Sequence, residues 1–153
     1  MAIEIERKFL VKHLPDHLPE GESIKQGYLH SDKALTVRVR TKGEKAFLTI
    51  KGATEGISRA EYEYEIPVAE AESMLSSLCR GPKIEKTRYT FQENGHLWEL
   101  DVFSGDNEGL TVAEVELQSE QETVRPPAWI GEEVSNDPRY FNSNLARKPF
   151  KSW

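Results

Sequence analysis

The sequence is poor in cysteine, because Cys79 is the only one among 153 residues. A single cysteine excludes a disulfide within the chain and a zinc site built from several thiolates. The neighbours of Cys79 indicate a buried position in a helix.

The sequence also lacks a long hydrophobic run. No apolar stretch approaches the roughly 20 residues that a membrane-spanning helix needs. A secretory leader would begin with basic residues followed by continuous apolar ones, whereas this chain opens with alternating acidic and apolar residues. We therefore expect no membrane partner and a cytoplasmic location.

The sequence has fewer basic than acidic residues. The 20 Lys and Arg residues stand against 26 Asp and Glu residues, which gives a net charge of −6. Because nucleic-acid binding needs clustered positive charge, we expect no nucleic-acid partner. The 37% hydrophobic and 30% charged residues are typical of a globular protein, and the length fits a single domain over residues 1–153.

Glycine-rich phosphate-binding loops are absent as well. Neither the pattern G-x-x-x-x-G-K nor the pattern G-x-G-x-x-G occurs in the sequence. Any phosphate group would therefore be bound by side chains on strands rather than by a loop of backbone N–H groups.

What the sequence does contain is a repeated alternation of polar and apolar residues, which is the pattern of β-strands. The loop signals between segments agree with antiparallel hairpins, since Gly43 separates two of them and the pair Asn94-Gly95 favours a type I′ turn. The predicted strands are 3–12, 25–30, 35–41, 45–51, 58–67, 84–91, 96–103 and 110–118.

One helix interrupts the strands, predicted over residues 69–79 by apolar residues at helical spacing and ended by Gly81 and Pro82. The segment from about 126 to 153 differs in character from the rest. Asp137 before Pro138 has the pattern of a helix N-cap and first helical residue. We interpret residues 126–153 as a C-terminal arm that packs on the domain or closes it, anchored by Trp129, Phe141 and Leu145.

Charged residues occupy one face of nearly every predicted strand. In the first strand Glu4, Glu6 and Lys8 share one face, while the other face carries the apolar residues Ile3, Ile5, Phe9 and Val11. The same alternation places these further residues on the charged faces: Arg38, Arg40, Lys51, Glu61, Glu63, Glu65, Lys86, Arg88, Glu99, Asp101, Glu114 and Glu116.

Two interpretations of the charged faces remain open at this point. The charged face of an antiparallel strand usually meets water. However, these positions are almost all ionisable and use paired arginines where lysine would solvate equally well. An eight-stranded barrel can hold one small ligand inside, and inward-facing charges would make it a wet tunnel, because uncompensated buried ions cost several kcal/mol each.

The residue types in such a tunnel would define its ligand. Clustered carboxylates without His or Cys ligands suit Mg2+ or Mn2+ better than Zn2+. Clustered Arg and Lys side chains suit a chain of phosphates. A metal-bound polyphosphate satisfies both sets of side chains.

The motif Glu4-x-Glu6-x-Lys8, followed in order by the paired basic and acidic strands, resembles the signature of the CYTH superfamily, the triphosphate tunnel metalloenzymes. The resemblance covers nearly the whole chain, and residues 131–140 are similar to the tail of its short bacterial members. It implies a closed, eight-stranded antiparallel β-barrel, mainly β with flanking helices, that forms a charged tunnel.

The resemblance also implies roles for individual residues. Glu4, Glu6 and Glu116 correspond to metal ligands, and Glu114 assists them directly or through water. Asp101, Glu61 and Glu63 would orient basic residues, or hold a second metal and the attacking water. The triphosphate-binding residues would be Lys8, Arg38, Arg40, Lys51, Lys86 and Arg88.

The activity implied is hydrolysis of inorganic triphosphate with Mg2+ or Mn2+ as cofactor. A class IV adenylate cyclase and a thiamine triphosphatase on the same fold remain alternatives. So do a polyphosphate-binding module without catalysis and a solvated sheet without a site. The partner is inorganic triphosphate or another small molecule that bears a triphosphate, and the protein is a monomer or a homodimer.

Overall fold

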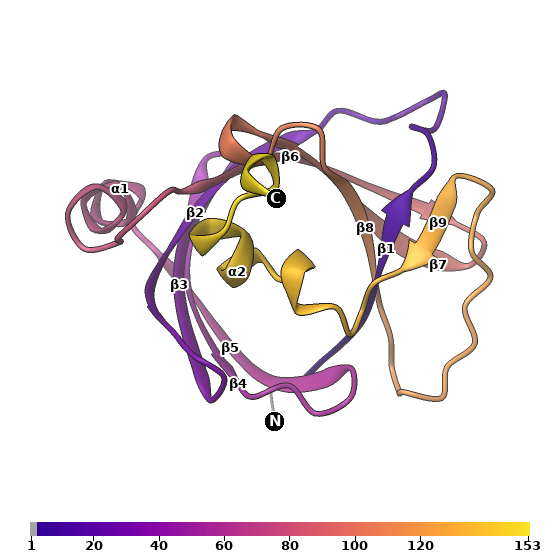
Figure 1. Ribbon diagram of the computed structural model, residues 1–153, viewed down its shortest axis with the longest axis horizontal. Helices are drawn as coiled ribbons and strands as arrows, with labels where there is room; N and C mark the ends of the chain where they lie inside the picture. The colour runs from indigo at the N-terminus through magenta and orange to yellow at the C-terminus, as the bar shows by residue number, and fades with distance from the viewer. Residues whose placement is uncertain (1–2) are drawn as a thin grey trace.

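A computed structural model describes residues 3–153 of the chain. Its strands form one antiparallel sheet in the order β5-β4-β3-β2-β6-β7-β8-β1-β9, and a further pairing of β5 with β1 closes it into a barrel (Figure 1). The strands are β1 (Ile3–Val11), β2 (Glu22–Ser31), β3 (Leu35–Lys42), β4 (Lys45–Gly52), β5 (Ser58–Ile66), β6 (Ile84–Glu93), β7 (His96–Ser104), β8 (Thr111–Glu116) and β9 (Ile130–Glu133).

The prediction of a closed eight-stranded barrel is confirmed, and β1 is the strand that closes it. Residues Ile3–Ile5 pair with β5, while residues Glu6–Leu10 pair with β8. The end of β1 also pairs with β9, a ninth strand outside the ring that the sequence did not predict. Its four residues, IGEE, are too few to show a period of two.

The remaining elements lie close to their predicted bounds. Helix α1 spans Val68–Ser77, and α2 spans Asn142–Arg147. The prediction of Cys79 as a helical residue was wrong: the residue is buried, but it lies beyond the end of α1. The Asp137 cap is confirmed, because its side chain accepts a hydrogen bond from the Arg139 N–H at the start of the short 3₁₀ helix Pro138–Tyr140.

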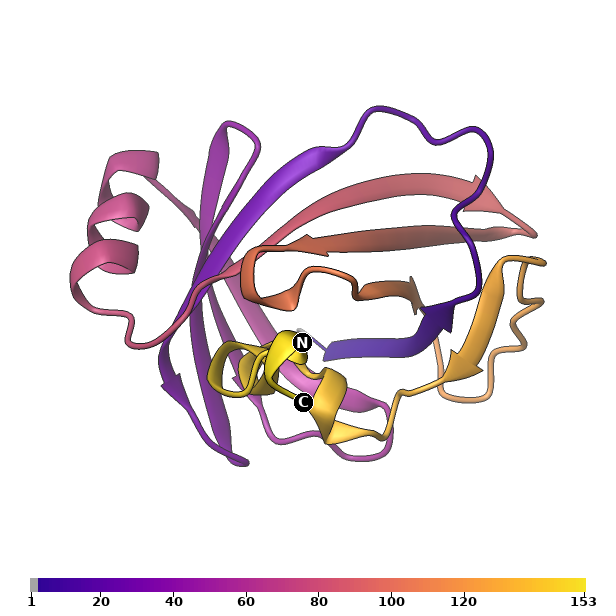
Figure 2. The ribbon, with the colours of Figure 1, turned by 45° about the horizontal axis from the view of Figure 1, so that its top comes forward.

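Apolar side chains cover the outside of the barrel in two places. Helix α1 packs Ala71 and Leu75 on Val39 and Ala46, and Figure 2 shows this helix standing outside the strands. On the other side, strand β9 and the segment that follows β8 cover a second apolar cluster around Trp98. In this cluster the ring of Trp98 lies tilted against Phe9 and edge to face against Trp129.

The part of the C-terminal arm that follows β9 packs inside one end of the barrel, whereas Trp129 and Ile130 of the same arm cover the outside. Tyr140 and Leu145 of the arm contact Ile84, Phe103 and Val112. These three strand residues alternate in step with Lys86, Asp101 and Glu114, so they point inward. The arm crosses the barrel opening in Figure 1 and thus closes this end with apolar side chains.

Among residues 3–153, no helix has the length and apolar character required to cross a membrane.

Candidate active site

The barrel encloses a cavity of about 260 Å³ whose walls carry charges of both signs. Strand register places the charged side chains in facing pairs: Glu6 lies opposite Glu116, and Lys8 lies opposite Glu114. Asp101 is buried behind the wall instead of lining the cavity. The other predicted site residues do line it: Glu4, Glu6, Lys8, Arg38, Arg40, Lys51, Glu61, Glu63, Lys86, Arg88, Glu114 and Glu116.

Glu4 is ionised by its neighbours. Its carboxylate oxygens both lie 3.2 Å from the Lys51 ammonium, and the Arg59 Nε donates to it at 3.3 Å. Burial opposes the charge, but Lys51 outweighs burial with the help of Arg59 and lowers the pKa of Glu4 to about 2. Glu4 therefore carries a negative charge at neutral pH.

Glu6 is in the opposite state. Burial raises its pKa well above the ordinary value, and the carboxylates of Glu114 and Glu4 raise it further. Burial also opposes the charge on Glu114, but Lys8 at 3.7 Å keeps the pKa of that carboxyl low. The two side chains share a hydrogen bond, which shifts the pKa of Glu6 upward and that of Glu114 downward.

This crowding of carboxylates fits a divalent cation in chemical terms. The carboxylates offer only oxygen atoms as ligands, and a cation would offset the repulsion from Glu114 and Glu4 that raises the pKa of Glu6. In the chain from residue 3 onward, however, no three Asp, Glu, His or Cys side chains are already arranged to hold an ion. The carboxylates would have to adjust when a cation binds.

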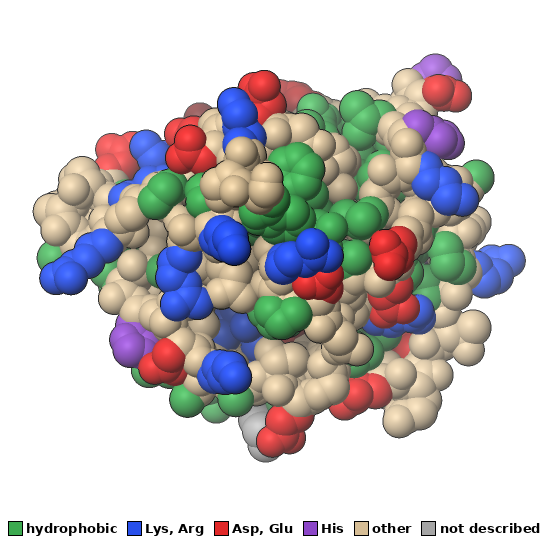
Figure 3. All heavy atoms as spheres, in the orientation of Figure 1, with side chains coloured by type: hydrophobic (Ala, Val, Ile, Leu, Met, Phe, Trp, Pro, Cys, Tyr) green, Lys and Arg blue, Asp and Glu red, His purple; other side chains and the backbone are tan. Residues whose placement is uncertain are grey.

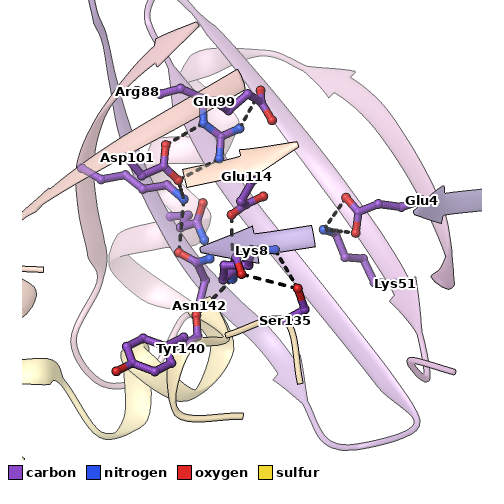
Figure 4. A network of polar contacts seen from close by, with 12 residues as sticks. Glu4, Lys8, Lys51, Arg88, Glu99, Asp101, Glu114, Ser135, Tyr140 and Asn142 are labelled. Atoms are coloured by element: carbon purple, nitrogen blue, oxygen red, sulfur yellow. Dashed lines mark hydrogen bonds and ion pairs between the residues drawn. The ribbon is translucent and has the colours of Figure 1, made fainter. Parts of the chain in front are cut away.

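Asp101 holds two basic residues in fixed positions. It accepts two hydrogen bonds from the Arg88 guanidinium, at 2.8 and 2.9 Å, and lies 2.7 Å from the Lys86 ammonium (Figure 4). Arg88 is also bound to Glu99 at 3.1 Å. Burial opposes ionisation of Asp101, yet Arg88 and Lys86 keep its pKa below the ordinary value.

Glu63 faces a second basic pair. One of its carboxylate oxygens lies 3.6 Å from both Arg38 and Arg40 and accepts a hydrogen bond from the Thr49 hydroxyl at 2.9 Å. The buried Nε atoms of Arg38 and Arg40 have no hydrogen-bond partner among the described residues. Burial, together with the charges of Arg38 and Arg88, lowers the pKa of Arg40 to about 10. An anion in the cavity would supply the missing partner and charge.

The C-terminal arm reaches the same cavity. The Lys8 ammonium donates to the Tyr140 carbonyl at 3.0 Å (Figure 4). The Lys86 ammonium donates to the Asn142 side-chain oxygen at 3.2 Å. The Lys8 backbone N–H donates to the Ser135 hydroxyl at 2.9 Å. The arm thus contacts two of the basic side chains that line the cavity.

Sequence reasoning missed several residues of this site. Arg59 could have been found, because it alternates in step with Glu61 on the same predicted strand. Tyr28 also lines the cavity and lies opposite Arg38, but no charged alternation marked its strand. Asn142 had no periodic signal at all, since it comes from the arm and its place depends on tertiary structure.

Comparison with known proteins gives consistent matches over the whole chain. Residues 2–149 match the model of the CYTH domain. The inorganic triphosphatase of Acetivibrio thermocellus is 51% identical over 154 residues, covering 100% of this chain and 99% of that protein. The inorganic triphosphatase of Nitrosomonas europaea is 44% identical over 147 residues, covering 94% and 96%. A solved structure of an inorganic triphosphatase matches with a TM-score of 0.70 at 40% identity, over 95% of each chain.

Proposed function

The chain belongs to the CYTH domain family, and from this we propose that it is an inorganic triphosphatase, which hydrolyses inorganic triphosphate in the barrel cavity. The relatives from Acetivibrio thermocellus and Nitrosomonas europaea are inorganic triphosphatases, and they match 100% and 94% of this chain. The observation that supports the proposal best is the unpartnered Nε of both Arg38 and Arg40 in a cavity lined by further basic residues. Such donors favour an anion with several phosphate groups.

We assign the metal to the carboxylates near the β1–β8 pairing. Glu4, Glu6 and Glu116 would hold Mg2+ or Mn2+, and Glu114 would assist them. When bound, such an ion would offset negative charge on the phosphate oxygens as a Lewis acid.

The basic side chains bind and orient the substrate. Phosphoryl transfer depends mainly on positioning and on stabilising the charge of the transferred group. Arg88 and Lys86 are suited to this because Asp101 fixes both of them before substrate arrives. The phosphate-binding set is Lys8, Arg38, Arg40, Lys51, Lys86 and Arg88.

A cavity-facing carboxylate orients the attacking water. Glu63 is partly exposed to the cavity and lies beside Arg38 and Arg40, so it is placed for this role. Water then attacks the terminal phosphorus in line, the bond from that phosphorus to the bridging oxygen breaks, and orthophosphate and diphosphate leave. Asp101 is shielded from the cavity by Arg88 and Lys86 and acts as a positioning residue.

Phosphate release tests the proposed activity directly. The purified protein is incubated with inorganic triphosphate, ATP or thiamine triphosphate, each with Mg2+, with Mn2+ and with a chelator. We expect cleavage of inorganic triphosphate that requires the metal and far exceeds cleavage of the other two. Formation of cyclic AMP and diphosphate from ATP would instead assign the cyclase activity, and tight binding without any turnover would indicate a binding module.

The rate should fall at alkaline pH because of Lys86. Burial lowers the pKa of this ammonium to about 8, although the Asp101 carboxylate favours the charged form. The other groups that face the Lys86 ammonium are Arg88, Glu114 and the neutral Asn142. The pH dependence of kcat/KM reports the pKa values of the free enzyme. We therefore expect kcat/KM to decrease as the pH rises through about 8, because Lys86 then loses its proton and its charge. A Lys86→Arg variant keeps its charge in this range and should move the decrease to higher pH. An unchanged profile in that variant would contradict the assignment.

A further inference from the structure

A second cavity, of about 440 Å³, lies on the C-terminal arm and shares no lining residue with the barrel cavity. Figure 3 shows Lys and Arg side chains gathered with hydrophobic ones on the face that the arm crosses. We call this cavity the arm groove. It is lined by Pro138, Arg139, Asn144, Arg147, Lys148 and Trp153.

The charge of the arm groove is opposite to that of the whole chain. Its lining contains three cationic side chains and no Asp or Glu side chain, whereas the net charge of the protein is −6. Arg139 is bound to Asp137 at 2.8 Å just outside the lining. Arg147 donates only to the neutral Asn144, and across residues 3–153 no carboxylate pairs with it or with Lys148. Two cations of the groove are therefore available to an anion.

The apolar part of the arm groove is an aromatic ring held in one orientation. Trp153 is 43% exposed, whereas the other two tryptophans, Trp98 and Trp129, are buried. Its indole N–H donates to the Lys148 carbonyl at 3.1 Å, and Phe150 and Tyr140 pack edge to face against it at 5.1 and 5.3 Å. The Arg139 guanidinium lies over the ring, 5.1 Å from its centroid, and these contacts leave the side chain 43% exposed. Because the ring is already fixed, the part of it that Arg139 leaves exposed can contact a planar ligand with little loss of conformational entropy.

We propose that the arm groove binds a nucleotide, with its base against Trp153 and its phosphate between Arg147 and Lys148. A bare phosphate would make no use of the exposed part of the indole, and an uncharged base would leave Arg147 and Lys148 unpaired. A ring that bears phosphate uses both features of the groove. The site is separate from the barrel cavity, although Tyr140 and Asn142, on the same arm, contact Lys8 and Lys86 there.

Titration of the full chain with AMP in the presence of a chelator tests this inference. Because Trp153 is the exposed tryptophan, AMP should quench the intrinsic fluorescence. Ribose 5-phosphate lacks the base, and adenosine lacks the phosphate. In calorimetry each should bind at least roughly tenfold more weakly than AMP. Equal binding of ribose 5-phosphate and AMP would mean a simple anion site and would overturn the nucleotide assignment.

Charge-matched variants locate the binding. The double variant R147Q/K148Q changes two exposed side chains and should weaken AMP binding roughly tenfold or more. The control K33Q/K45Q removes the same charge at exposed positions outside both cavities and should bind AMP as the wild type does. Lys51→Gln, in the barrel, should also leave AMP binding unchanged. Absence of binding by the wild type, or a loss with Lys51→Gln but not with R147Q/K148Q, would overturn the proposal.

Discussion

Changing Asp101 to Ala is expected to lower the free energy of unfolding by roughly 3–5 kcal/mol, the usual loss when one partner of a buried ion pair is removed. Asp101 is 1% exposed and is the shared partner of Lys86 and Arg88, which are also buried. Without it, two like charges would lie side by side with only the partly exposed Glu99, which is bound to Arg88, as a counterion. Urea denaturation at pH 7 measures the loss.

Glu99 provides the control for this experiment. It lies two residues before Asp101 on β7, points to the same side and also binds Arg88, but its side chain is 25% exposed. Glu99→Ala should therefore cost at most about 1 kcal/mol. Equal losses for the two variants would show that the burial of Asp101 is not what makes its removal costly.

The pH dependence of the Asp101 effect has a definite sign. The folded protein holds the pKa of this carboxyl below its ordinary value of 3.8. Its contribution is thus fully present above 3.8 and is lost as the pH falls through the lower pKa of the folded state. The difference in stability between the wild type and Asp101→Asn should accordingly shrink in acid.

Changing Glu6 to Gln is expected to lower kcat/KM for inorganic triphosphate by roughly 100-fold or more, in the range seen when one charge-stabilising group is removed from an active site. The substitution removes one of the proposed metal ligands. Because Glu6 is crowded by Glu4 and Glu114, the same change relieves repulsion in the metal-free protein. The melting temperature without metal should therefore stay the same or rise while activity is lost.

Glu132→Gln is the matched control, since Glu132 is exposed on β9 and outside the cavity. Its activity should equal that of the wild type. The concentration of Mg2+ needed for half-maximal rate should rise in Glu6→Gln, as also expected for Glu4→Gln and Glu116→Gln. Full activity with an unchanged metal requirement would show that the carboxylates have been assigned wrongly.

The alternation of residue types was sufficient to predict the barrel strands and which charged residues share one face of each strand. A period of two survives in the sequence because each strand has one charged and one apolar face. Which face points inward was not determined by the pattern and followed only from the family resemblance. Asp101 shows what else the pattern leaves open. The pattern predicted that this carboxylate lies on the charged face of its strand, but not that it is buried behind Arg88.

The position of the arm could not be predicted for a different reason. Ile84 lies in step with Lys86, and Phe103 lies in step with Asp101, so apolar and charged residues share the inward face. A pattern of alternation does not reveal that this face changes from charged to apolar along the barrel axis. The apolar part of the inward face is the surface that Tyr140 and Leu145 contact. Its position can be recognised only when the register of the strands is known.

The closing role of β1 has a consequence for how the protein becomes active. The strands β2 to β5 and β6 to β8 form hairpins with neighbours in the chain, whereas β1 must wait for β5 and β8. Pairings between segments far apart in sequence form late, because loop-closure entropy is lost before they are stabilised. The β1–β8 pairing spans more of the chain than the β1–β5 or β2–β6 pairing, so the carboxylates of β1 are expected to meet those of β8 late in folding. A partly folded chain has no complete site, and a triphosphate that contacts both halves would favour the closed ring by mass action.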